Sequence, residues 1–201
     1  MKKISRLLLL LLVSVLLSNC ASFSNKDFKN DYTKINESNL LSFNGKYSFY
    51  PIKKFDKKNP NSQYDISKNI INSYNYITND ILKFDDKDSI VKGLTEYHIE
   101  LNLINNTDLD VALFKNNNSI KKQQIKGELK NDGMFYLDNK YLKCNGIPYL
   151  FGGCNNNKRR ITLSKNNNLI INEALDNTGA LLFIFWAGQS YNGVYEFKRL
   201  E

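Results

Sequence analysis

The chain has 201 residues, of which 42% are hydrophobic, 24% charged and 12% aromatic, so it can fill one hydrophobic core but is too short for a multidomain enzyme. It contains 30 asparagines, yet its 12 Tyr and 12 Phe residues exclude a disordered chain, which would be poor in aromatic side chains. The formal net charge is +8, and the basic residues are scattered rather than gathered into a nucleic-acid-binding run. We therefore expect no nucleic-acid partner.

Residues 1–19 have the plan of a bacterial export signal, because three basic residues precede an apolar run from Leu7 to Leu17 that is too short to cross a bilayer as a helix. The run leads into Leu17-Ser18-Asn19-Cys20, which resembles the lipobox of bacterial lipoproteins, although Asn19 stands where Gly, Ala or Ser is usual. The resemblance implies cleavage before Cys20 and a diacylglycerol on its thiol, so that two or three acyl chains anchor the protein to a membrane. The alternative is an ordinary secreted protein whose signal ends near a cysteine.

Residue 21 bears on the destination of such a lipoprotein. An aspartate after the cysteine would resemble the inner-membrane retention signal of many Gram-negative lipoproteins, so Ala21 favours the outer membrane, on its periplasmic or surface face. Residues 20–42 are rich in Ser, Asn, Lys and Asp with isolated aromatic residues. This composition predicts a flexible tether after the lipidated N-terminus at Cys20 that the lipobox resemblance implies.

Residues 43–201 are predicted to form a single β domain. A first strand is expected over 43–51, where aromatic residues alternate with polar ones up to Pro51. Apolar residues then recur every three or four positions after a candidate N-cap at Asp65. This period predicts one helix over about 65–83, packed against the sheet.

From Thr95 onward, apolar and polar residues alternate with the period of a half-buried strand. Strands are expected at 97–103 and 109–113, in a segment that ends near Lys130, at 134–142, 161–163 and 169–171, and around 195–197. Asn-rich or Asp-Gly turns are expected between them at 105–108, 116–118, 131–133 and 166–168. A longer loop is expected before 161–163. Ala180–Ala187 is apolar on both faces, which predicts a central strand followed by a turn at 188–193. This succession of short strands and turns predicts a mainly β fold, which is either an antiparallel curved sheet or a small closed barrel of about eight or nine strands.

Three segments carry a family resemblance: Gly45-Lys46-Tyr47, the stretch Lys126–Leu129 with Asp132–Tyr136, and Tyr195–Arg199. Their turn-and-aromatic patterns resemble those of a group of small uncharacterised bacterial lipoproteins, over most of the chain after the signal. The resemblance implies a lipid-anchored, mainly β envelope protein without catalytic residues. A looser resemblance is to lipocalin-like barrels, with Tyr47 in place of the tryptophan of their Gly-x-Trp start, and it implies an apolar ligand inside a barrel.

Cys144 and Cys154 are the two cysteines that remain once Cys20 is assigned to lipid, and the envelope is a compartment in which disulfides form. We interpret them as a disulfide that closes a loop of about ten residues. Two buried free thiols, or a metal or redox pair, are the alternatives. A redox pair usually has two residues between its cysteines, and zinc would need further ligands.

Candidate catalytic residues are few. His98 is the only histidine, and alternation places it on the polar face of its strand beside Glu96 and Glu100, which predicts a solvated side chain. An enzyme would have to combine His98 with distant carboxylates, and an acid–base pair would have to come from residues such as Glu128, Glu173 and Glu196.

Other catalytic patterns are missing from the sequence. There is no Gly-x-Ser-x-Gly elbow and no phosphate-binding glycine loop, and Asp85, Asp86 and Asp88 lack the turn glycine of a calcium loop. We therefore expect no enzymatic activity, no metal and no cofactor. The sequence predicts an outer-membrane lipoprotein whose β domain is a structural or interaction module; the alternative is a lipocalin-like binder of a small apolar ligand.

Overall fold

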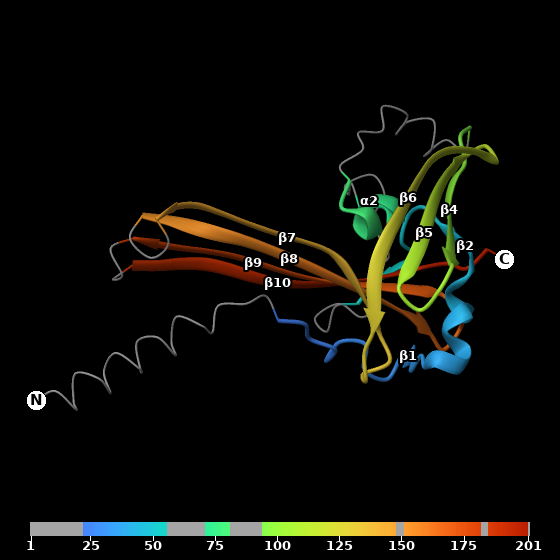
Figure 1. Ribbon diagram of the computed structural model, residues 1–201, viewed down its shortest axis with the longest axis horizontal. Coiled ribbons are helices and arrows are strands. Elements are labelled where there is room, and N and C mark those ends of the chain that lie inside the picture. The colour runs from blue at the N-terminus through green and yellow to red at the C-terminus, as the bar shows by residue number, and fades with distance from the viewer. Residues whose placement is uncertain (1–21, 56–70, 81–93, 148–150, 182–184, 201) are drawn as a thin grey trace, which may run out of the picture. The chain divides into compact units, whose positions relative to one another are not determined.

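The computed structural model describes residues 22–55, 71–80, 94–147, 151–181 and 185–200 (Figure 1). The fold is mainly β, as predicted. Its elements in chain order are β1 (Tyr32–Thr33), the 3-10 helix η1 (Glu37–Phe43), β2 (Gly45–Ser48), β3 (Lys53–Lys54), α2 (Ser73–Thr78), β4 (Tyr97–Leu103), β5 (Asp108–Lys115), β6 (Asn118–Leu129), β7 (Phe135–Ile147), β8 (Phe151–Ser164), β9 (Leu169–Leu181) and β10 (Phe185–Phe197). The strands form one curled antiparallel sheet in the order β2-β4-β5-β6-β7-β8-β9-β10-β3, and β1 pairs with β8.

The chain divides into two compact units. The core unit contains Phe23–Lys140, Lys158–Glu173 and Asn192–Glu201, and the hairpin unit contains Tyr141–Asn157 and Ala174–Tyr191 with the N-terminal residues up to Ser22. Strands β7 to β10 contribute residues to both units. Each of these strands is 13 or 14 residues long, which is more than the predicted strands at the same places.

The tight turns are closed by asparagine and glycine, as the sequence predicts at 116–118, 131–133 and 166–168. Asn116, Asn117 and Asn167 have φ values of 47°, 62° and 60°, and Gly133 has a φ of 78°. Asparagine tolerates this left-handed region better than other side chains do, and glycine enters it without strain. The asparagine excess thus has a structural use in the described turns.

Three predictions about the later strands are wrong. Ala180–Ala187 is not one central strand, because β9 ends at Leu181 and the neighbouring strand β10 begins at Phe185. The predicted turn at 188–193 lies within β10, and the loop expected before 161–163 consists largely of the ends of β7 and β8. The period of apolar residues cannot distinguish a buried strand from a hairpin with apolar ends.

Helix α2 is shorter than the predicted helix over 65–83. Asn72 is extended, and its side chain accepts a hydrogen bond from the backbone N–H of Asn75, which caps the helix start. Asn79 ends the helix in the left-handed conformation, with a φ of 60°. The remaining parts of the predicted helix, 65–70 and 81–83, lie outside the described residues. Asparagine competes for backbone hydrogen bonds, so it limits the helix to Ser73–Thr78.

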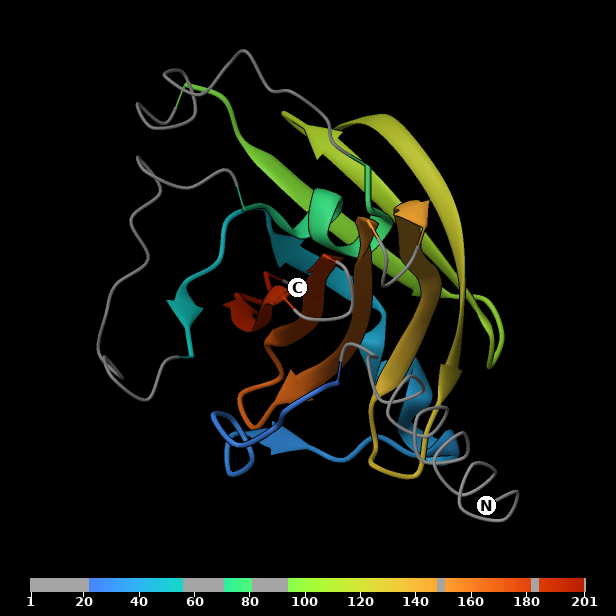
Figure 2. The same cartoon turned by 90° about the vertical axis from the view of Figure 1, so that its left-hand side faces the viewer.

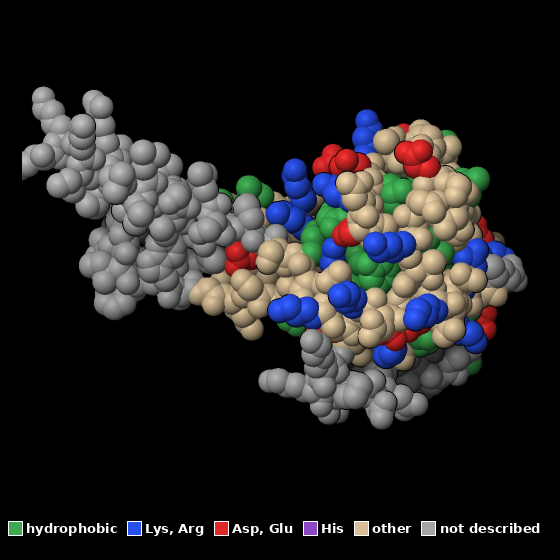
Figure 3. Space-filling model, turned by 90° about the horizontal axis from the view of Figure 1, so that it is seen from below, with side chains coloured by type: hydrophobic (Ala, Val, Ile, Leu, Met, Phe, Trp, Pro, Cys, Tyr) green, Lys and Arg blue, Asp and Glu red, His purple; other side chains and the backbone are tan. Residues whose placement is uncertain are grey.

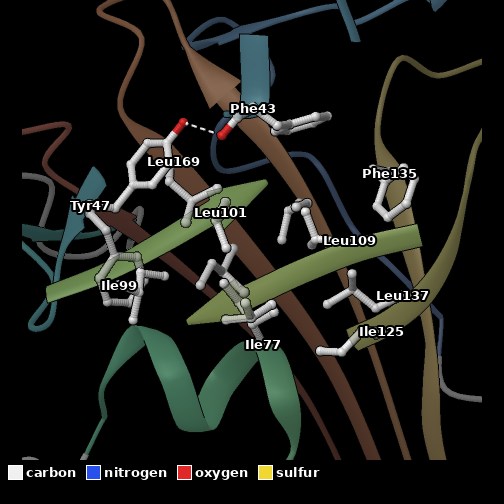
Figure 4. Close-up of a cluster of buried hydrophobic side chains, with 14 of the residues drawn as sticks. Phe43, Tyr47, Ile77, Ile99, Leu101, Leu109, Ile125, Phe135, Leu137 and Leu169 are labelled. Atoms are coloured by element: carbon white, nitrogen blue, oxygen red, sulfur yellow. Dashed lines mark hydrogen bonds between the residues drawn. The ribbon is translucent and has the colours of Figure 1, made fainter. Parts of the chain in front are cut away.

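The concave face of the sheet in the core unit is filled by side chains (Figure 4). Alternate residues of β4 and β5 point inward and are buried: Ile99, Leu101, Leu103, Leu109, Val111 and Leu113. Helix α2 lies inside the curl of the sheet (Figure 2) and adds Tyr74 and Ile77 to the same cluster. Burial of these apolar side chains is the main stabilising term of the unit.

The two ends of the curled sheet meet through the residues that follow β10. The backbone N–H of Ser48 donates to the carbonyl of Lys198, and the N–H of Leu200 donates to the carbonyl of Lys46, both at 2.8 Å. Arg199 donates from Nη1 to the Tyr47 hydroxyl at 3.1 Å. Strand β2 is therefore bonded on both sides, to β4 and to the chain after β10.

The flexible tether expected over 20–42 is wrong from Phe23 onward. Phe28, Ile35 and Leu40 are buried in the core unit, and Tyr32 of β1 pairs with Ser164 of β8. The isolated apolar residues of this segment pack into the core unit and hold the segment against it, which composition alone does not reveal. The signal peptide expected at 1–19 and the lipidation site Cys20 lie outside the described residues. In the described ranges, no helix is long and apolar enough to cross a membrane.

Candidate functional site

A shallow groove lies on the outer face of β4, β5 and β6. At its centre the small side chain of Ala112 stands in register with Glu100 on one side and Lys122 on the other. The longer neighbours leave a hollow of about 460 Å³, lined by Glu100, Asn102, Asp110, Val111, Ala112, Phe114, Lys122, Gln123 and Gln124. The groove can hydrogen-bond and ion-pair with a polar partner.

Charges alternate in sign across the outer face of these strands. Lys46 of β2 is in register with Glu100 of β4, and Asp108 of β5 is in register with Lys126 of β6. Hydrogen bonds from the side chains of Asn105 and Thr107 lower the pKa of the Asp108 carboxyl, and Lys126 lowers it further. The face is thus built from opposite charges on neighbouring strands, the arrangement that stabilises a sheet.

His98 is buried, so the predicted solvated side chain is wrong. Its imidazole stacks on the ring of Phe114, its cross-strand partner, with ring centroids 4.8 Å apart and planes 6° apart. Its Nε2 lies 3.8 Å from a carboxylate oxygen of Glu100. Alternation identifies the face of β4 on which His98 lies but not the ring that covers it, and His98 is not among the residues that line the groove.

The three carboxylates considered as an acid–base pair have separate partners. Glu128 lies 3.6 Å from the ammonium of Lys130, Glu173 lies 3.1 Å from Arg159, and Glu196 accepts a hydrogen bond from Asn168 at 2.9 Å. Within the described ranges, no group of three His, Cys, Asp or Glu side chains could hold a metal ion. Asp85, Asp86 and Asp88 lie outside these ranges.

Arg160 organises a polar cluster that sequence reasoning missed. Its guanidinium donates to Asn172 from Nε at 2.8 Å, and from Nη1 to the Asp132 carboxylate and the Tyr136 hydroxyl, both at 2.9 Å. The ring of Phe23 covers the guanidinium, whose carbon lies 4.4 Å from the ring centre. Burial raises the pKa of Tyr136, and its hydrogen bond to Asp132 adds to the rise, while Arg160 opposes it.

The adjacent Arg159 forms a buried ion pair with Glu173 of the neighbouring strand β9. Nη2 of Arg159 donates to the Glu173 carboxylate at 3.1 Å, and both side chains are almost fully buried. Arg159 and Arg160 are adjacent in strand β8, so their side chains lie on opposite faces of the sheet. Two arginines in succession within a strand are the sequence feature that could have indicated a buried arginine. Two buried arginines are unusual in a small domain, because a buried charge needs a partner.

Basic side chains do not gather into one patch on the face shown in Figure 3. They are spread among uncharged and hydrophobic side chains. This distribution on the face agrees with the scattered lysines of the sequence.

Cys144 of β7 and Cys154 of β8 have their sulfur atoms 2.07 Å apart, at the bonding distance of a disulfide. This geometry fits the first interpretation of the pair. Both cysteines belong to the hairpin unit, where the Ser190 hydroxyl also donates to the Asp176 carboxylate of β9.

Comparisons of the chain with protein-family models, with curated proteins and with solved structures find no match.

Proposed function

We propose that this protein is a lipoprotein of the bacterial envelope, anchored through Cys20 to the outer membrane, and that its β domain acts as a structural or interaction module without enzymatic activity. The observation that carries the anchor is the sequence Leu17-Ser18-Asn19-Cys20 at the end of an apolar run. A thioether-linked diacylglycerol on Cys20 and a further acyl chain bind a bilayer almost irreversibly.

Two features of the core unit support the interaction role over the binding of an apolar ligand. The concave face, where a lipocalin-like ligand would lie, is occupied by large buried side chains such as Tyr74, Phe43 and Phe135. The groove, by contrast, lies open on the outer face and is bordered by charged side chains such as Glu100, Asp110 and Lys122, which suits a protein partner better than a small apolar molecule.

Metabolic labelling with a clickable fatty acid tests the anchor. Cells that express the full chain should label the protein and retain it in the outer-membrane fraction. The Cys20→Ala variant should lose the label and leave that fraction, because the only thiol at the lipobox is gone.

The matched control is the double variant Cys144→Ser/Cys154→Ser, which removes the other two cysteines and should keep the label. Label that survives Cys20→Ala, or a wild-type protein that never acquires label, would overturn the anchor. Native mass spectrometry of the detergent-free protein tests the alternative function, since a co-purified apolar molecule would favour the ligand binder.

A further inference from the structure

Strand β6 separates from β7 soon after the turn that joins them. The two strands pair only at Gly127–Leu129 with Phe135–Leu137. On its other side β6 pairs with β5 from Asn118 to Lys126. In the described part of the chain, no strand pairs with the far side of β6 over Asn118–Lys126, which leaves about nine residues of edge.

The register identifies the backbone groups on this edge. Gly127 donates its N–H to Thr107 at 2.7 Å, across to the β5 side, so residues 125, 123 and 121 also face β5. Lys130 donates its N–H to Met134, towards β7. This bond shows independently that the even-numbered residues of β6 from Lys122 onward direct their backbone groups away from β5. The N–H and C=O groups of Lys122 and Gln124 therefore point away from β5, and both residues are exposed. The carbonyl of Lys126 points the same way, but the pairing of Gly127 with Leu137 assigns it to β7.

Two features fix the place at which the strands separate. A Cβ atom on Gly127 would lie 2.3 Å from the Phe135 ring, so the close approach of β6 and β7 at the fork depends on glycine. Beyond the fork, helix α2 bridges the two strands from the concave side: Asp80, just after the helix, pairs with Lys121 of β6, and Asn139 of β7 donates to the carbonyl of Ile77. The edge is a built feature of the core unit and not a frayed end.

The edge is cationic. Lys122 and Lys126 lie on the outer face. Lys126 has Asp108 opposite it on β5, whereas Lys122 has Ala112 opposite it and Glu100 one strand further. A further strand beside β6 would continue the alternation if it carried carboxylates opposite Lys122 and Lys126. Gln124 between them lines the groove, so the same strand would also border the groove.

We propose that the β6 edge over Asn118–Lys126 binds an extended, acidic segment of a partner protein as an additional strand. Backbone hydrogen bonds to Lys122 and Gln124 supply the affinity, and the ammonium groups of Lys122 and Lys126 select acidic side chains. Lysines on a free edge can also serve only to prevent aggregation between sheet edges. The experiment must therefore distinguish that protective role from the binding of a partner strand. The inference rests on the proposed interaction role. The anchor experiment detects lipid on Cys20 and does not depend on peptide binding, so the lipid anchor and the binding edge can each be refuted separately.

The probe is a fluorescent nine-residue peptide in which Glu alternates with Thr, titrated against the purified full-length protein and followed by anisotropy. Charge reversal in Lys122→Glu/Lys126→Glu should weaken binding about tenfold or more, since two cross-strand attractions become repulsions. The matched control is Lys165→Glu/Lys198→Glu, which makes the same charge change at two exposed lysines elsewhere in the core unit and should leave the affinity within about twofold.

Backbone methylation of the peptide distinguishes strand addition from simple charge attraction. One peptide is N-methylated at its Glu residues and a second at its Thr residues, so that in each case one edge of the peptide loses its donors. Strand addition requires that one of the two peptides loses binding and the other keeps it.

Three results would overturn the proposal. They are no binding of the acidic peptide by the wild-type protein, equal effects of the two lysine double variants, and equal binding of both methylated peptides. Amide hydrogen exchange of the free protein gives a further check. Slow exchange at Lys122 and Gln124 would mean that another segment of the chain already covers the edge, which also contradicts the proposal.

Discussion

The guanidinium of Arg160 is covered by the ring of Phe23, with 4.4 Å from its carbon to the ring centre. Phe23 also meets the ring of Tyr136 edge-on, with centroids 5.3 Å apart, and the backbone N–H of Ser24 donates to Asn192 at 3.0 Å. Within the described residues, packing against the core unit is thus present from Phe23, three residues after Cys20. An anchor on Cys20 would therefore hold the core unit close to the lipid headgroups.

The first prediction concerns this attachment. Arg160→Met should lower the free energy of unfolding by about 1–3 kcal/mol, because the Asp132 carboxylate loses its cationic partner and Asn172 loses a donor. It should also speed cleavage by trypsin after Lys26 and Lys29, since Phe23 loses the surface on which it lies. Urea unfolding and timed proteolysis measure the two effects. Unchanged cleavage rates, with Lys165→Met as the control, would contradict the attachment.

The buried pair of Arg159 and Glu173 predicts a larger loss. Glu173→Gln removes the charge that compensates a guanidinium inside the sheet, and we expect a loss of about 3–5 kcal/mol. The double variant Arg159→Met/Glu173→Leu should recover most of it, because no buried charge is left. A double variant that is less stable than Glu173→Gln would show that the ion pair is needed for more than neutralisation.

Gly127 predicts a steric effect at the fork of β6 and β7. Gly127→Ala would place a methyl group against the buried Phe135 ring, which we expect to cost about 1–3 kcal/mol. Gln124→Ala, three residues away on the same strand and exposed, should change stability by less than about 0.5 kcal/mol. Thermal or urea unfolding of the two variants gives the comparison, and equal stabilities would argue against the close approach.

The cysteine pair predicts a redox-dependent stability. A disulfide around a loop of about ten residues contributes about 2–3 kcal/mol, chiefly by restricting the unfolded chain. Mass spectrometry after alkylation without reduction should find Cys144 and Cys154 unmodified, and unfolding in the presence of reductant should occur at lower urea. Alkylation of both cysteines in the unreduced protein would refute the bond.

Two buried tyrosines predict a loss of stability at high pH. Burial raises the pKa of Tyr47 to about 12, with Arg199 opposing the rise, and burial likewise raises the pKa of Tyr74 to about 12, with Asp80 adding to it. The unfolded chain releases these protons near pH 10, earlier than the folded chain. The stabilisation is therefore complete below pH 10 and declines as the pH rises towards 12.

Urea midpoints at pH 9 and pH 11 measure this decline, and Tyr47→Phe and Tyr74→Phe should each reduce it. At pH 7 the two variants should differ. The Tyr47 hydroxyl donates to the carbonyl of Phe43 at 2.9 Å (Figure 4), so its removal should cost about 1 kcal/mol. The Tyr74 hydroxyl is buried without a hydrogen-bond partner among the described residues, so Tyr74→Phe should be neutral or stabilising.

The sequence predicted the strands best where polar and apolar residues alternate and an asparagine turn follows. Residues 97–103 and the turn at 116–118 are examples, because one face of β4 and β5 is buried and the other is solvated. It failed for Ala180–Ala187, since a run that is apolar on both faces carries no period that shows where a hairpin turns.

The candidate site was less predictable, because its elements come together only in three dimensions. The free edge of β6 follows from the fork at Gly127, which has no signature in a single sequence. Similarly, the roles of Phe23 and Arg160 depend on a contact between residues more than a hundred positions apart. The cysteine pair was accessible from the sequence because a short separation and the expected compartment were sufficient.

The bonds between β2 and the residues after β10 determine the order in which the sheet can form. Lys198 donates its N–H to the Ser48 hydroxyl across a separation of 150 residues, and contacts this distant form slowly because a long loop must close first. A chain that has completed β2, β4 and β5 still lacks the second neighbour of β2 until residues 198–200 have been synthesised. The curl of the sheet therefore closes last, after the whole chain is available.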